Sequence, residues 1–207
     1  MNRLLLGILL FTSYTLAAQD EYLKGELYLS NGTIKSGYLQ LPVITANTVS
    51  LKGREKIKFK ENWSSKEFDK YFEKDVDSLV LSDGRFYEFI PIRNKRKTLC
   101  MLLSTGKQRL YSRYVANVSS HTISGASTHS SMVTMRTSTN YPQEFYALKE
   151  GASIASPLVK YGPLGVTFKR YAISYFKDCK SIVAKIRNKT YQKEDILEMI
   201  SEYEGCE

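Results

Sequence analysis

The chain has 207 residues, of which 43% are hydrophobic and 25% are charged, and its formal net charge is +9. This balance is typical of a globular protein and excludes an intrinsically disordered chain. The positive excess could attract nucleic acid, anionic lipid headgroups or acidic glycans, but it is spread along the chain and forms no basic tail.

The first eighteen residues have the pattern of a secretory signal peptide. A basic start at Met1–Arg3 precedes the apolar run Leu4–Phe11, and the small residues of Thr15–Ala18 suit a signal peptidase. The run is too short to span a bilayer, which takes about 20 residues, and no later segment is apolar enough to do so. No cysteine precedes Cys100, which argues against a lipoprotein. We expect a periplasmic or secreted protein that begins near Gln19; a buried N-terminal strand or helix is the alternative.

Residues 19–118 are predicted to be rich in β-strands. Three Leu-Ser-X-Gly turns separate strand-like runs, at Leu29–Gly32, Leu81–Gly84 and Leu103–Gly106. The Asn-Gly and Asp-Gly pairs of the first two turns suit two-residue hairpin loops, because these residues adopt positive φ at little cost. In the third turn a threonine precedes the glycine, so a longer or bulged connection is expected.

The remainder of this region reads as further strands and one loop. The alternation in Lys56–Lys60 predicts a half-buried strand whose isoleucine and phenylalanine face the core. Thr48–Leu51 is expected to pair with this strand, and Glu61–Lys74 to form a loop with one helical turn. Pro91 should mark the edge or the end of its strand, because proline cannot donate to a β-ladder.

Residues 119–140 differ sharply in composition, because twelve of the twenty-two are Ser or Thr. Both histidines of the chain, His121 and His129, fall in this segment. We expect a flexible loop or insert, or an extended hairpin.

Residues 141–207 are predicted to begin with a short strand and to end in a helical hairpin. Apolar residues from Phe168 to Ile186 recur mostly at helical spacing, and Asn188 or Thr190 can cap a second helix. The expected fold class is therefore α+β, with an antiparallel sheet or a partly closed small β-barrel packed against this hairpin in one domain.

The three cysteines suggest one disulfide, since export makes disulfides possible. Cys179 and Cys206 flank the C-terminal helical region, whereas Cys100 lies in an apolar run. The economical pairing is Cys179–Cys206, with Cys100 as a small buried hydrophobe. Three free thiols are the alternative.

Candidate catalytic groups are few. A hydrolytic triad needs a base, and His121 and His129 are the two available histidines. Neither histidine belongs to a zinc-binding spacing, and burial would make Cys100 inert. The chain has no phosphate-binding loop or dinucleotide fingerprint, so no cofactor is expected. The remaining carboxylate pairs, which read as solvated positions, are Asp75 with Asp77 and Glu194 with Asp195.

A basic and aromatic face is easier to support. Its candidate residues are Arg93, Lys95, Arg96, Lys97, Arg109, Tyr111, Arg113 and Tyr114. Such a face can bind single-stranded nucleic acid, which an exported protein rarely meets, and it could also stack on sugars or peptide. The alternatives are a solvated loop for the basic run and core positions for the tyrosines.

Several stretches carry a family resemblance. They are Lys24–Leu27 with Asn31–Tyr38, Asp75–Leu79 with Asp83–Tyr87, Gly106–Tyr111, and the tail from Asp178 through Tyr203 to Cys206. These stretches resemble a family of uncharacterised exported proteins from Bacteroidota. The resemblance implies export and a β-rich body with a C-terminal helical hairpin, without an activity. Asp77-Ser78-Leu79 also resembles an O-glycosylation site of Bacteroidota, which would place a glycan on Ser78.

We therefore predict a non-enzymatic protein of the periplasm or cell envelope that binds a partner protein or glycan. One alternative is an envelope hydrolase that uses His121 or His129. The other is a binder of anionic surfaces or polyanions through the basic and aromatic face.

Overall fold

The computed structural model describes residues 22–42, 44–45, 55–93, 96–125, 132–162 and 165–206. The predicted signal peptide and Thr48–Leu51 lie outside these residues. The described strands are β1 (Leu23–Leu29), β2 (Ile34–Gln40), β3 (Ile44–Thr45), β4 (Lys56–Lys60), β5 (Asp69–Phe72), β6 (Val76–Leu81), β7 (Phe86–Arg93), β8 (Arg96–Ser104), β9 (Gln108–Gly125), β10 (Met132–Asn140), β11 (Gln143–Lys149), β12 (Ser156–Gly162) and β13 (Gly165–Thr167). The described helices are α1 (Lys169–Tyr175), α2 (Lys180–Arg187), the 3-10 turn η1 (Lys193–Asp195) and α3 (Ile196–Glu204).

The described strands form one open sheet. Their order is β13-β12-β11-β9-β8-β7-β6-β1-β2-β4-β5, and β10 and β3 also pair with β9. β3 runs parallel to β9, and neighbours along the main path are antiparallel. The predicted α+β class is confirmed. Since the path has two ends, the sheet is open and does not close into a barrel.

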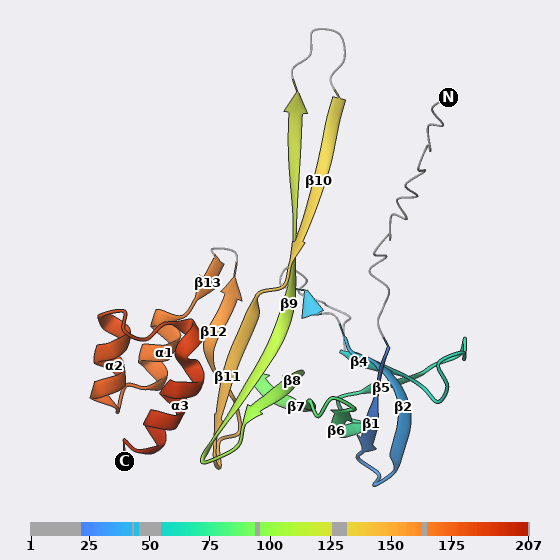
Figure 1. Ribbon diagram of the computed structural model, residues 1–207, viewed down its shortest axis with the longest axis horizontal. Coiled ribbons are helices and arrows are strands. Elements are labelled where there is room, and N and C mark those ends of the chain that lie inside the picture. The colour runs from blue at the N-terminus through green and yellow to red at the C-terminus, as the bar shows by residue number, and fades with distance from the viewer. Residues whose placement is uncertain are drawn as a thin grey trace, which may run out of the picture.

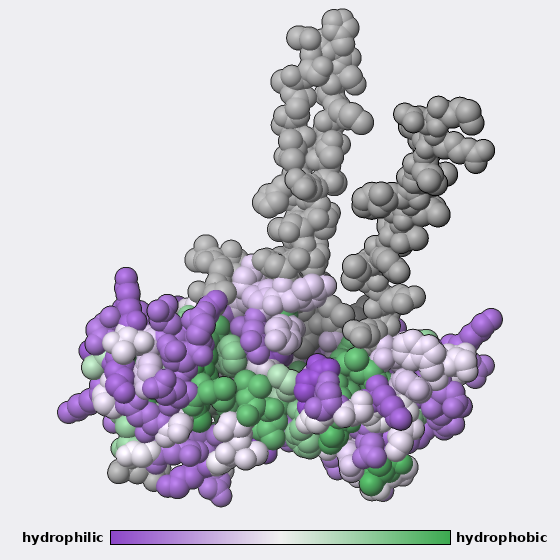
Figure 2. Space-filling model, in the orientation of Figure 1, coloured by the Kyte–Doolittle hydropathy of each residue, from purple (hydrophilic) through white to green (hydrophobic). Residues whose placement is uncertain are grey.

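The helices cover one end of the sheet. Figure 1 shows them beside β11–β13, while β1, β2, β4 and β5 lie at the opposite end. A core cluster joins Leu110, Leu158 and Val159 of the sheet to Phe176 and Ile182 of the helical part. In Figure 2 hydrophobic side chains also gather in the middle of the visible face, between these two ends. Burial of apolar area against the sheet therefore holds the short helices in place.

Two of the Leu-Ser-X-Gly turns close three-residue loops, not the two-residue loops predicted. In the first, the Gly32 amide donates to the Leu29 carbonyl and the Leu29 amide donates to the Thr33 carbonyl, both at 2.9 Å. The second repeats these bonds between Leu81, Gly84 and Arg85. Positive φ occurs at the two glycines and not at the residues before them, as in a type I turn followed by a left-handed glycine. A two-residue type I′ turn would need positive φ at both positions.

The third turn is irregular, as predicted. The β8–β9 register shifts between Leu102 and Ser104, and Gly106 does not have positive φ. All three turns thus join antiparallel neighbours of one sheet.

The Lys56–Lys60 prediction is confirmed, because Ile57 and Phe59 are buried and the lysines lie at the surface of β4. The loop prediction for Glu61–Lys74 is wrong in part, since residues 69–72 form β5 along the free edge of β4. Pro91 pairs with β8, whereas β6 pairs with β7 only from Phe86 to Glu88. Proline has no amide hydrogen, and Pro91 lies beyond the part of β7 that pairs with β6. No bond of that ladder is therefore lost at Pro91.

The Ser/Thr-rich segment is an extended hairpin over its described residues. Residues 117–125 of β9 pair in continuous antiparallel register with residues 132–140 of β10. Figure 1 shows this ribbon projecting from the rest of the sheet. Of the two predicted forms, hairpin and flexible loop, the backbone of the described part adopts the hairpin.

The predicted first helix is divided in two. α1 ends at Tyr175 and α2 begins at Lys180, with the Cys179 amide donating to the Phe176 carbonyl in the turn between them. The second predicted helix begins later than expected, because Gln192 and Asp195 form a reciprocal capping box before α3. Asn188 instead ends α2 as its C-cap.

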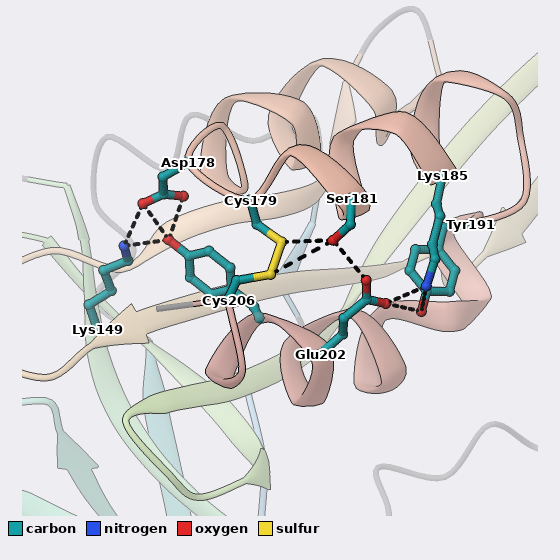
Figure 3. Close-up of a disulfide and its surroundings, with 9 residues drawn as sticks. Lys149, Asp178, Cys179, Ser181, Lys185, Tyr191, Glu202 and Cys206 are labelled. Carbon is teal, nitrogen blue, oxygen red and sulfur yellow. Dashed lines mark hydrogen bonds and ion pairs between the residues drawn. A yellow bond between two sulfur atoms is a disulfide. The ribbon is translucent and has the colours of Figure 1, made fainter.

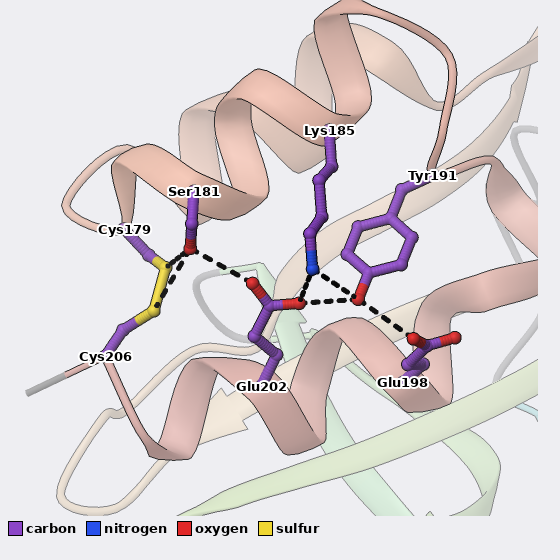
Figure 4. A network of polar contacts seen from close by, with 7 residues as sticks. All are labelled: Cys179, Ser181, Lys185, Tyr191, Glu198, Glu202 and Cys206. Atoms are coloured by element: carbon purple, nitrogen blue, oxygen red, sulfur yellow. Dashed lines mark hydrogen bonds and ion pairs between the residues drawn. A yellow bond between two sulfur atoms is a disulfide. The ribbon is translucent and has the colours of Figure 1, made fainter.

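The predicted disulfide Cys179–Cys206 is confirmed, with 5.7 Å between its Cα atoms, and Cys100 is free and buried. The bridge joins the start of α2 to the end of α3 (Figure 3). Beside it, the Ser181 hydroxyl donates to Glu202, whose other oxygen accepts from Lys185 at 2.7 Å and from Tyr191 (Figure 4). The disulfide and this polar network therefore connect the same two helices. No described helix is long and apolar enough to cross a membrane.

Candidate functional site

A groove of about 280 Å³ opens near the middle of the sheet. Its floor is built by register, since Tyr87 of β7, Met101 of β8 and Ser112 of β9 are direct neighbours across three strands. Side chains at paired positions share one face of a sheet, so the three residues point the same way. The remaining lining residues are Leu41, Pro42, Arg85, Leu99, Arg113, Tyr114 and Tyr141. We call this set the tyrosine groove.

The Ser112 hydroxyl is the most unusual group in the tyrosine groove. Ser112 is 0% exposed, and its Oγ has no hydrogen-bond partner among the described residues. A buried hydroxyl without a partner costs about 1–3 kcal/mol, so native proteins rarely leave one unpaired. Ser112 thus borders the groove with a hydroxyl that is buried and has no partner among the described residues.

Exposed aromatic rings form the rim of the tyrosine groove. Tyr114 is 57% exposed and Tyr141 is 59% exposed. Tyr87 lies deeper, where burial raises the pKa of its phenol although Arg85 opposes this effect. Asp83 holds the Arg85 side chain, with 2.7 Å between Nε and Oδ2. The rim therefore offers ring faces and edges, while the nearby guanidinium already has a partner.

Arg113 is fixed by a buried ion pair with Glu144. Its Nε and Nη2 each lie 2.8 Å from Glu144 Oε2, and the two side chains are 11% and 3% exposed. The Tyr146 hydroxyl and the Tyr161 amide complete the bonds of Glu144. Both carboxylate oxygens are occupied, so Glu144 is a structural group and not a free acid or base.

A second carboxylate anchors Arg113 from the other side. The Arg113 Nη1 donates to Thr98 Oγ1 at 2.8 Å, and the Thr98 hydroxyl donates to Glu55. Glu55 also accepts from the Leu99 amide at 2.7 Å. This network joins β8, β9 and β11 beneath the groove. It connects three strands that lie around the groove.

The structure divides the predicted basic and aromatic face. Tyr111 is fully buried and donates to Glu88, and Arg109 lies 3.4 Å from the same carboxylate. Arg113 is committed to its ion pairs, and Tyr114, on the other face of β9, contributes an exposed ring to the groove. Lys97 is exposed at the start of β8. Lys95 lies outside the described residues, and the backbones of Arg93 and Arg96 pair with each other.

The candidate catalytic groups do not converge in the described part. His121 lies in the projecting ribbon, where its backbone pairs with that of Arg136, and His129 lies outside the described residues. Among described residues, no group of three or more His, Cys, Asp or Glu could hold a metal ion. Burial raises the pKa of Cys100, so its thiol stays protonated. The hydrolase alternative thus gains no support.

The carboxylate pairs have structural contacts. Asp75 accepts from the Phe72 amide at 3.0 Å, and Asp77 accepts from the Ser30 hydroxyl at 2.8 Å. Asp195 caps the start of η1, and Glu194 lies beside Lys193. These contacts account for the pairs without a catalytic role.

Ser78 lies in β6 between β1 and β7, opposite Tyr28 and Glu88. Its side chain is half-buried, and the following residue, Leu79, is fully buried. Modification of Ser78 stays a prediction.

Sequence reasoning missed most of the groove, although one signal was available. In a strand, Ser112 and Tyr114 face away from Tyr111 and Arg113, so the tyrosines of this segment belong to different surfaces. Met101 and Tyr141 enter the groove through strand register and a connection, which periodicity does not predict.

Comparison with known proteins finds no matching family model, no matching curated protein and no matching solved structure. The resemblance to exported Bacteroidota proteins therefore stays a prediction.

Proposed function

We propose that the protein is an exported, non-enzymatic binding protein whose tyrosine groove receives an apolar side chain of a partner protein. The observation that carries this proposal is the buried Ser112 hydroxyl, which has no partner in the described part of the chain, at the base of a largely apolar groove. Binding sites of this kind combine apolar walls with a few polar groups that fix the orientation of the ligand. The anchoring side chain would therefore carry, or lie beside, one polar atom that bonds to Ser112.

The composition of the rim supports a protein partner more than a glycan. Tyrosine and arginine are enriched where an anchor side chain of a partner is bound, and Tyr114 and Tyr141 are exposed at this rim. A sugar needs many hydrogen-bonding groups, yet Arg85 and Arg113 are already bound to carboxylates. The volume of the groove suits one or two side chains.

Export is supported by the disulfide. Structural disulfides persist in oxidising compartments such as the periplasm, and the Cys179–Cys206 bridge joins two helices that pack on the sheet. The amino-terminal pattern described above is the independent sequence argument for the same compartment.

Site-specific photo-crosslinking tests the proposal in the native envelope. A benzoylphenylalanine residue replaces Tyr114 or Tyr141 in turn, and replaces the equally exposed Leu197 of α3 as the matched control. We expect one partner segment, mapped by mass spectrometry, to crosslink at both groove positions and not at position 197. Crosslinks only to a glycan, or only to this chain's own residues 46–54, would contradict a protein partner.

A further inference from the structure

A second basic and aromatic surface lies at the end of the sheet that carries β2, β4 and β5. Its centre is Trp63, the one tryptophan of the chain, which is 61% exposed in the β4–β5 connection. This end of the sheet lies away from the helices (Figure 1). A tryptophan so exposed is unusual, because burial of this side chain stabilises a fold more than that of most others.

Two other aromatic rings pack against the indole of Trp63. Its indole packs edge-on against Tyr38, with 5.4 Å between ring centroids, and lies 6.5 Å from Tyr22. Phe68, at the end of the same connection, is 39% exposed. The exposed aromatic surface is therefore an ordered part of the fold.

Lysines surround these rings on one face of the sheet. Lys60 Nζ lies 4.4 Å from the centre of the Tyr22 ring, and Lys58 and Lys70 lie 5.1 and 5.4 Å from the centre of Phe68. The register explains the cluster, since Lys60 is opposite Tyr38 and Lys58 is opposite Lys70. We call Lys58, Lys60, Lys70, Trp63 and Phe68 the lysine–aromatic face.

The lysines of this face carry positive charge beside a cavity that holds three carboxylates. Within the described residues, none of Lys58, Lys60 and Lys70 has an ion pair, whereas nearby Lys35 lies 3.1 Å from Asp69. Ammonium groups over rings keep their charge available to an anion outside the protein. An adjacent cavity of about 560 Å³ shares Lys60 and Phe68 with this face and is also lined by Glu61, Glu67 and Asp69, so an anion would bind on the side of Lys58 and Lys70 and not in the cavity.

We propose that the lysine–aromatic face docks on an anionic lipid surface. Tryptophan prefers the boundary between headgroups and acyl chains, and phenylalanine can enter the same layer. Lysine side chains next to these rings can extend to lipid phosphates, each contributing about 1 kcal/mol near an anionic surface. Trp63 and Phe68 would thus insert while the three lysines bind the headgroups.

Tryptophan fluorescence tests this proposal, because the single tryptophan of the chain, Trp63, lies on this face. The full chain is mixed with vesicles of equal parts phosphatidylglycerol and phosphatidylcholine, and with vesicles of phosphatidylcholine alone. We expect a blue shift of the emission and quenching by brominated acyl chains with the anionic vesicles, both weakened by added salt. An unchanged spectrum contradicts the proposal.

Two charge-matched triple variants show whether the location is correct. Lys58→Gln/Lys60→Gln/Lys70→Gln should weaken vesicle binding about 100-fold, from about tenfold or less per lysine. Lys169→Gln/Lys177→Gln/Lys180→Gln removes the same charge from exposed positions in α1, α2 and the turn between them, and should change binding little. Equal losses in the two variants would contradict docking through this face. Binding to an acidic polysaccharide without quenching by brominated lipid would assign the face to a polyanion instead and overturn the proposal.

Discussion

Arg113 in β9 and Glu144 in β11 form an ion pair that is almost fully buried, with 2.8 Å between Nη2 and Oε2. The pair lies on the face of β9 opposite Ser112. It lies beside the core cluster that contains Tyr111 and Tyr146. Both side chains of the pair are held by hydrogen bonds within the protein. We therefore expect the pair to contribute to the stability of the fold.

Removing one charge of this pair should be costly. Glu144→Gln leaves the Arg113 guanidinium buried beside a neutral amide, and we expect the free energy of unfolding to fall by about 3 kcal/mol. The exposed pair Lys193–Glu194 provides the control, since Glu194→Gln should cost less than about 1 kcal/mol. Urea unfolding of both variants measures the difference. Equal small losses would show that the buried pair is not a structural support.

The disulfide should stabilise the helical end. Its loop has a sequence separation of 27 residues, for which loop entropy predicts a contribution of about 3 kcal/mol. We expect Cys179→Ser/Cys206→Ser to lower the unfolding free energy by that amount and to abolish its dependence on reductant. Cys100→Ala should leave the dependence on reductant intact, because Cys100 is free. Mass spectrometry with and without reductant checks the bridge itself.

Stability should depend on pH through the network between α2 and α3. Hydrogen bonds from Lys185, and then from Tyr191 and Ser181, lower the pKa of Glu202. A lowered carboxyl pKa stabilises the fold above the unfolded value of about 4.3, and this stabilisation is lost as the pH falls through the folded pKa. Glu202→Gln should therefore reduce the acid dependence of unfolding between about pH 4.5 and lower values. An acid limb that keeps its slope in this variant would contradict the assignment.

The same network predicts an alkaline effect. The hydrogen bond to Glu202 raises the pKa of Tyr191 to about 12. A raised phenol pKa stabilises the fold below the unfolded value of about 10, and the contribution disappears as the pH rises towards 12. Tyr191→Phe should flatten this limb of the unfolding curve, which urea titrations from pH 9 to 12 can follow. Tyr171→Phe, in the neighbouring helix α1, is the matched control.

Close strand packing predicts intolerance at Gly37. It lies opposite Gly25, and a Cβ there would come 2.9 Å from two ring atoms of Phe59 and would also meet the Lys60 carbonyl. We expect Gly37→Ala to destabilise the fold by about 1–3 kcal/mol. At Gly205 an added Cβ comes no nearer than 3.5 Å to Glu202, so Gly205→Ala should be tolerated. Similar melting temperatures for the two variants would contradict the tight approach of β2 and β4.

Local patterns predicted the elements better than the surfaces. Alternation identified β4, turn residues identified three hairpins, and helical spacing identified the C-terminal end, because each depends on neighbours in the chain. For Tyr111 the sequence left a core position and a binding face open; the structure shows the core position, where its partner Glu88 comes from a strand two places away in the sheet. The exposure of Trp63 likewise depends on how the β4–β5 connection folds over β2. Sites assembled by strand register are therefore the part that sequence patterns predict least.

Ser112→Ala tests the account of the tyrosine groove most directly, with the exposed strand residue Ser36→Ala as its control. The measurement is the crosslinking yield to the partner segment from benzoylphenylalanine at position 114, in each serine variant. One hydrogen bond contributes about 0.5–1.5 kcal/mol, so we expect the yield at limiting concentration to fall about two- to tenfold for Ser112→Ala and to stay unchanged for Ser36→Ala. The folded protein itself should be as stable as the wild type or more so, because the unpaired hydroxyl has been removed. An unchanged yield for Ser112→Ala would contradict the role of this hydroxyl in binding.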